Sequence, residues 1–63
     1  MENGIYKNEN ATFFVKDDKV IMRLKGSYYK TNENFMLAVK RVEPLSAGMI
    51  NSFDRAYKGA PSW

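Results

Sequence analysis

The chain has 63 residues, of which 44% are hydrophobic, 14% aromatic and 27% charged, and its formal net charge is +3. It contains no cysteine and no histidine, which excludes disulfide frameworks, zinc–thiolate and iron–sulfur sites, and catalysis by an imidazole base. A chain of this size is expected to form one domain, because chains divide into several domains only beyond roughly 250 residues.

Short β-strands separated by turns are expected in the first two-thirds of the chain. Residues 4–7 and 11–16 are the first two, since each contains β-branched or aromatic residues and precedes a turn-prone asparagine or aspartate. The clearest strand covers residues 19–25, where Val20 and Met22 lie on one face in the two-residue period of a half-buried strand.

Asp17 and Asp18 are expected to form the two-residue loop between the second and third strands, because aspartate tolerates turn conformations. This loop places Val15 opposite Val20, so the apolar side chains of both strands fall in one layer. A turn also explains this adjacent carboxylate pair better than acid–base chemistry does.

A second hairpin is predicted to turn at Gly26 and Ser27, because glycine readily adopts the positive φ that two-residue loops need. It leads into a strand over residues 28–31. Pairing across this turn directs Tyr29 toward the interior and Tyr28 outward.

A fifth strand is expected over residues 35–42. If Asn34 adopts the left-handed conformation in a three-residue loop, then Phe35, Leu37 and Val39 all point inward. We favour this loop because it buries three large apolar side chains.

The apolar period becomes helical after Pro44, which predicts a helix over residues 46–58. Ser46 is its expected N-cap, and Gly59 and Pro61 are expected to end it. The apolar stripe of this helix consists of Leu45, Met49, Ile50, Phe53, Ala56 and Tyr57.

The predicted fold is therefore α+β: an antiparallel meander of three to four strands with one C-terminal helix packed on one face. A small SH3-like or OB-like barrel is the alternative. The helix is expected to cover the face that carries Phe13, Val15, Val20, Met22, Leu24, Tyr29, Phe35, Leu37 and Val39.

The opposite face of the sheet is expected to be basic and aromatic. Residues 19–41 carry six basic side chains against one acidic side chain, a local charge of +5 that the modest total conceals. The cations expected on this uncovered face are Lys16, Lys19, Arg23, Lys25, Lys30 and Lys40, and its apolar residues are Phe14, Ile21, Tyr28 and Met36.

This pattern indicates a non-catalytic binding module that docks its basic, aromatic face on an acidic protein partner, as a small regulator or inhibitor, for example a viral one, would. Phe14, Arg23, Lys25 and Tyr28 are expected to supply most of the binding energy, while Lys16, Lys30 and Lys40 steer the partner. One alternative is a nucleic-acid-binding protein, in which bases of single-stranded RNA or DNA stack on the rings. A second is a small homodimeric structural protein. If the sheet instead closes into a barrel, Phe14 and Ile21 would fill a second small core.

No catalytic, cofactor or metal site is expected. The serines have no histidine partner, and the four glycines are too scattered for a phosphate-binding loop. A cytoplasmic location without membrane insertion is expected, since no signal sequence is visible and no apolar run approaches the ~20 residues of a membrane span. The role of Trp63 stays open.

Overall fold

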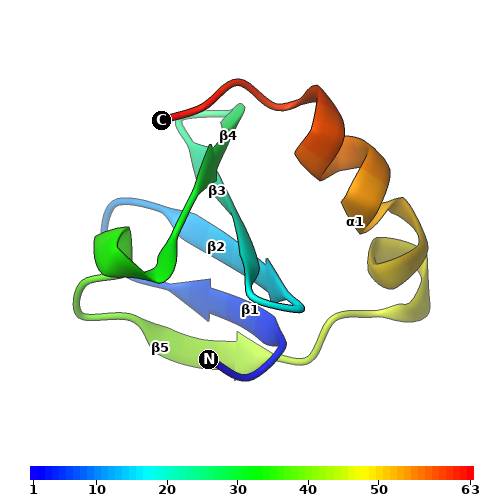
Figure 1. Cartoon of the computed structure of the whole chain (residues 1–63). Coiled ribbons are helices and arrows are strands. Elements are labelled where there is room, and N and C mark those ends of the chain that lie inside the picture. Colours follow the sequence, from blue (N-terminus) through cyan, green and yellow to red (C-terminus); the bar gives the residue numbers. More distant parts are fainter.

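The computed structural model describes the whole chain, residues 1–63, as five strands, one 3₁₀ turn and one α-helix (Figure 1). All strand pairs are antiparallel, and the strand order in the sheet is β4-β3-β2-β1-β5. The predicted α+β class is thus confirmed, as an open sheet whose edge strands β4 and β5 do not pair. The strands are β1 (Gly4–Lys7), β2 (Thr12–Lys16), β3 (Lys19–Leu24), β4 (Ser27–Thr31) and β5 (Lys40–Glu43).

The hairpin between β2 and β3 has the predicted loop and register. Asp17 and Asp18 have φ angles of 50° and 66°, and Val15 is paired with Val20. Positive φ at both loop residues is the conformation that matches the twist of the flanking strands. The two acidic residues therefore serve the turn.

The hairpin between β3 and β4 turns one residue earlier than predicted, at Lys25 (φ 51°) and Gly26 (φ 83°). Tyr28 consequently pairs with Arg23 instead of Lys25. Because the register shift is two residues, every side chain in β4 keeps its predicted face. Lys25 itself moves from the strand into the turn.

The segment between β4 and β5 contradicts the predicted strand over residues 35–42. It forms the 3₁₀ turn η1 (Glu33–Phe35), and β5 begins only at Lys40 and pairs with β1. The predicted burial is also wrong, because Leu37 is 71% exposed whereas Met36 is 7% exposed. The reason is local: the Asn32 side chain caps η1 by accepting a hydrogen bond from the Asn34 backbone N–H.

The larger hydrophobic core lies on the sheet face away from the helix. There the connection between β4 and β5 lays Met36 and the half-buried Val39 over the strands. The core residues, all nearly fully buried, are Tyr6, Phe13, Val15, Val20, Met22 and Met36. The radius of gyration, 10.4 Å, is what a compact domain of this length has (about 10.6 Å).

Helix α1 (Ala47–Gly59) packs on the other face of the sheet, so the prediction that it covers Phe13 and its neighbours is wrong. Its single buried residue, Phe53, is 4% exposed and lies with Ile21 and Phe14. The connection carrying Met36 already covers the Phe13 face, which leaves only the alternate face for the helix. Ile5 and Ile21 are buried on that face. A second small core therefore forms there, but it lies under α1 on an open sheet and not inside the barrel of the alternative prediction.

The ends of α1 follow local capping rules. Ser46 is the N-cap as predicted, and its hydroxyl accepts a hydrogen bond from the Met49 backbone N–H at 3.2 Å. At the other end the helix runs through Gly59, and the Ala60 N–H bonds to the Tyr57 carbonyl. The helix is too short and too polar to cross a membrane.

Candidate functional site

Five residues form a line across the sheet, on the face that carries α1. Directly paired residues of antiparallel strands point to the same side of a sheet. The pairing joins Lys40 to Lys7, Lys7 to Thr12, Thr12 to Arg23, and Arg23 to Tyr28. We call this line the cationic row: Lys40, Lys7, Thr12, Arg23 and Tyr28.

The cationic row is accessible and its charges are not neutralised. Lys7, Arg23 and Lys40 are exposed, and none of them takes part in an ion pair. Glu9 borders a surface hollow together with Arg23 and Lys25, but it pairs with neither. Unpaired cations on one face produce a positive potential that attracts acidic surfaces.

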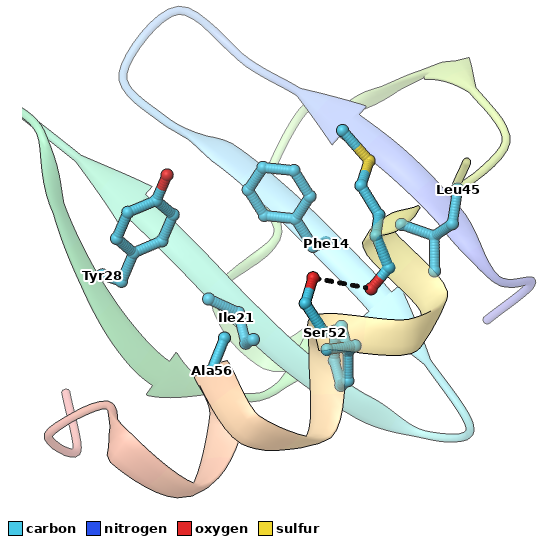
Figure 2. A pocket seen from close by; sticks show the side chains of 8 residues that line it. Phe14, Ile21, Tyr28, Leu45, Ser52 and Ala56 are labelled. Carbon is cyan, nitrogen blue, oxygen red and sulfur yellow. Dashed lines mark hydrogen bonds between the residues drawn. The ribbon is translucent and has the colours of Figure 1, made fainter. Parts of the chain in front are cut away.

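A groove lies between α1 and the sheet (Figure 2). Its volume is about 220 Å³, and seven of its eight lining residues are hydrophobic. The hydroxyl of Ser52, the one polar residue, bonds back to the helix carbonyl of Gly48 at 2.9 Å. We call it the helix–sheet groove; its lining is Phe14, Ile21, Tyr28, Leu45, Met49, Ser52, Phe53 and Ala56.

Tyr28 belongs to both the groove and the row, so the two surfaces are continuous. The residue is 47% exposed, and its ring centre lies 6.4 Å from that of Phe14, with an angle of 40° between the ring planes. Arg23 lies directly across from Tyr28 on the neighbouring strand. An apolar surface is thus bordered by the guanidinium of Arg23.

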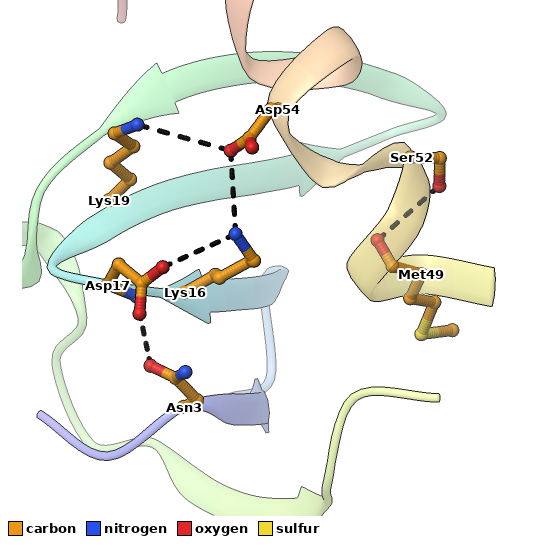
Figure 3. A network of polar contacts seen from close by, with 7 residues as sticks. All are labelled: Asn3, Lys16, Asp17, Lys19, Met49, Ser52 and Asp54. Atoms are coloured by element: carbon orange, nitrogen blue, oxygen red, sulfur yellow. Dashed lines mark hydrogen bonds and ion pairs between the residues drawn. The ribbon is translucent and has the colours of Figure 1, made fainter. Parts of the chain in front are cut away.

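The cations at the other end of this face contact α1 (Figure 3). The Asp54 carboxylate forms ion pairs with Lys16 at 3.6 Å and with Lys19 at 4.0 Å. Lys16 also lies 5.9 Å from the ring centre of Phe53, and Lys30 lies 5.4 Å from that of Tyr57. The expectation that this face is free of the helix is therefore wrong for Lys16 and Lys30. It is wrong as well for Phe14 and Tyr28, which line the groove beside α1.

A hydrogen bond between neighbouring side chains shifts two pKa values at this end. The Lys16 ammonium donates to the Asp17 carboxylate at 3.3 Å, and this contact holds the pKa of Asp17 below its ordinary value. The same hydrogen bond, assisted by Asp54, raises the pKa of Lys16. Both shifts favour the charged forms, so Lys16 and Asp17 are charged near neutral pH.

The structure brings together some of the predicted binding residues and separates others. Phe14, Arg23 and Tyr28 adjoin one another, and Lys25 is exposed in the turn that follows Arg23. Lys7 joins them through the pairing of β1 with β2, and Lys40 through the pairing of β5 with β1. Lys7 was not among the predicted residues because the register of the first strand against the second was not predicted. The groove was not predicted because α1 was expected on the opposite face.

A second hollow lies on the face away from α1, with a volume of about 380 Å³. Phe13 and Met22 contribute to its lining from the core, and the exposed Phe35, Leu37 and Trp63 line it from the surface. Its polar residues are the Asn8–Asn10 turn, including the carboxylate of Glu9. This hollow has no cation, so it differs in charge from the cationic row.

No cluster of three or more acidic side chains that could hold a metal ion is present. Comparison with protein-family models, with curated proteins and with solved structures finds no match to this chain.

Proposed function

We propose that the protein is a non-catalytic binding module that regulates or inhibits a protein partner by docking on its acidic surface. The observation that carries the proposal is the cationic row. Its cations Lys7, Arg23 and Lys40 are exposed, and none of them forms an ion pair with an acidic side chain of the chain. Lys25 extends the same positive surface at the β3–β4 turn. The expected cytoplasmic location is part of this proposal.

A protein partner fits this surface better than a nucleic acid does. Binding of single strands depends on flat exposed rings on which bases stack, and here Phe14 is half-buried, leaving Tyr28 as the accessible ring. A base entering the groove would also leave its polar edges without partners, because Ser52 donates its hydroxyl hydrogen within α1. A self-paired dimer through this face would oppose two like-charged rows, which disfavours the homodimer alternative.

The test is capture of a partner by the tagged protein from nuclease-treated lysate, with two charge-reversal variants compared. Arg23→Glu inverts the centre of the cationic row, whereas Arg55→Glu makes the same change at an exposed position on α1. We expect Arg23→Glu to abolish capture of a protein that the native chain and Arg55→Glu both retain. Equal capture by the native chain, Arg23→Glu and Arg55→Glu would show that the cationic row is not part of the interface.

The alternatives are tested with oligonucleotides and by sedimentation. If the partner is a nucleic acid, single-stranded oligonucleotides bind at low salt and their affinity falls steeply as salt rises. If the face is a dimer seam, the sedimentation coefficient rises with protein concentration and Arg23→Glu changes that dependence. We expect neither behaviour.

A further inference from the structure

We infer that the partner segment combines one large apolar side chain with adjacent carboxylates: the apolar side chain enters the helix–sheet groove while the carboxylates pair with the cationic row. This inference rests on the proposed function and specifies the chemistry of the segment that the module recognises. It follows from the size of the groove, from the distribution of charge along it, and from a contact within the chain itself.

The groove has the dimensions of a site for a single side chain. Its volume of about 220 Å³ lies below the roughly 300–1,000 Å³ of pockets that hold drug-sized ligands or cofactors. Its walls are apolar, so an aliphatic or aromatic group enters without losing hydrogen bonds. Met49, which is 38% exposed, forms part of the helix wall, and its flexible thioether side chain can adapt to the entering group.

Charge along the groove differs between its two ends and sets the orientation of the segment. At one end Asp54 already pairs with Lys16 and Lys19, so a further carboxylate there would be repelled by the Asp54 carboxylate. At the other end Tyr28 leads to Arg23, whose charge is unpaired. The carboxylates of the bound segment therefore lie at the Arg23 end.

The spacing of the row indicates how the carboxylates are arranged. Arg23 and Lys7 are on strands separated by β2 alone, which places their backbones roughly 10 Å apart. An extended peptide covers about the same length in three residues. A segment with an apolar residue followed by acids one and four positions later can therefore reach both cations.

The chain itself already docks such a pair on this face. In α1, Phe53 buries its ring against the sheet while the adjacent Asp54 carboxylate reaches Lys16. Lys16 lies over the Phe53 ring as well. The combination of an aromatic ring and a neighbouring carboxylate is thus compatible with this sheet face, and the groove with Arg23 offers a second, unfilled place for it.

The experiment is a titration of the ¹⁵N-labelled full chain with a synthetic peptide, followed by amide chemical shifts. The peptide carries one phenylalanine with aspartates one and four residues later, in a glycine–serine background. We expect shifts at Phe14, Ile21, Tyr28 and Met49 together with Arg23. Replacing the phenylalanine by alanine should weaken binding at least tenfold, and replacing the aspartates by lysine should abolish it.

Two protein variants locate the two parts of the site separately. Ala56→Leu adds bulk inside the groove at an exposed helical position that leucine suits, and we expect at least a tenfold loss of peptide affinity. Arg23→Glu should remove binding, while Arg55→Glu should leave it unchanged. Amide spectra of the free variants verify that each one is folded.

The outcomes separate the failure of this inference from the failure of the proposed function. No shifts at millimolar peptide, or shifts that Ala56→Leu leaves unaltered, would show that the groove does not hold the apolar side chain. The proposed function would still stand if Arg23→Glu abolished capture of the protein partner. If Arg23→Glu affected neither peptide binding nor capture, both would be wrong.

Discussion

The ammonium nitrogen of Lys16 lies 3.6 Å from Oδ1 of Asp54, across the junction between β2 and α1 (Figure 3). This contact joins a strand cation to the helix that the alternation pattern had assigned to the other side of the sheet. Three of the sheet's lysines, Lys16, Lys19 and Lys30, approach acidic or aromatic side chains of α1 in this way. The basic face is therefore divided between an end that holds the helix and an end that stays open.

The hydrophobic attachment of α1 depends on Phe53, its one buried residue. Phe53→Ala should lower the free energy of unfolding by about 3 kcal/mol, as truncation of a buried phenylalanine does. That is a large part of the stability of a domain this small. Urea denaturation followed by circular dichroism measures it.

Met49→Ala is the control for this prediction, because Met49 lies on the same helix but is 38% exposed. We expect it to cost less than about 1 kcal/mol, since little area is lost from the interior. Equal losses for the two variants would show that α1 does not depend on the Phe53 contact.

Two glycine substitutions are expected to have opposite signs. At Gly26 and Gly48 a Cβ would meet no atom within 4 Å, so only backbone conformation matters. Gly48 is helical, and Gly48→Ala should stabilise the protein by about 1 kcal/mol. Gly26 has a φ of 83°, and Gly26→Ala should destabilise it by about 1 kcal/mol.

Thermal unfolding of both glycine variants measures these effects in one experiment. A stabilising Gly26→Ala would contradict the left-handed turn at Lys25 and Gly26, whereas a destabilising Gly48→Ala would contradict the helical first turn of α1. The native chain, unfolded under the same conditions, is the reference for both.

Those elements that depend on near neighbours were predictable from the sequence. Alternation identified β3, Asp17 and Asp18 identified a turn, and Ser46 identified the start of α1. Each of these signals acts within a few residues. Even the misplaced turn at Gly26 preserved the faces of β4, because the resulting shift was an even number of residues.

Which face α1 covers could not be predicted in the same way. Either α1 or the connection between β4 and β5 could cover the Phe13 face. Which of them covers it depends on whether Met36 or Phe35 points inward. A change of one residue in loop length reverses that choice, and the capping of η1 by Asn32 decides it. The groove and the place of Lys40 in the cationic row both follow from this long-range outcome.

Stability should fall at acidic pH partly through Asp17. Its pKa is lowered in the folded state, chiefly by the hydrogen bond from Lys16, from an ordinary value of 3.8. The carboxylate therefore stabilises the fold above pH 3.8, and this contribution is lost as pH falls from 3.8 through the lower folded pKa. Carboxyl NMR titration should give a pKa below 3.8 for Asp17.

The variant Lys16→Gln tests the cause of that shift. It removes the charged donor but keeps a polar side chain, so the pKa of Asp17 should rise toward 3.8 and the acid unfolding curve should become shallower below that pH. Lys58→Gln, at an exposed lysine of the last helical turn, is the matched control and should change neither. An unaltered Asp17 pKa in Lys16→Gln would mean that the Lys16 contact does not cause the shift.

Trp63 should stabilise the β4 edge of the sheet. Its backbone N–H donates to the Lys30 carbonyl at 2.9 Å, and its ring meets that of Tyr29 edge-on at 5.1 Å. Trp63→Ala should therefore lower the free energy of unfolding by about 1 kcal/mol, the usual contribution of such an aromatic pair. Ser62→Ala should leave it almost unchanged, because the exposed Ser62 side chain makes no such contact.

Trp63 is the only tryptophan, so the fluorescence of the protein measures whether its ring packs on Tyr29. The emission should shift to longer wavelength as urea unfolds the protein. An emission maximum already equal to that of the unfolded chain would show that the ring does not rest on Tyr29.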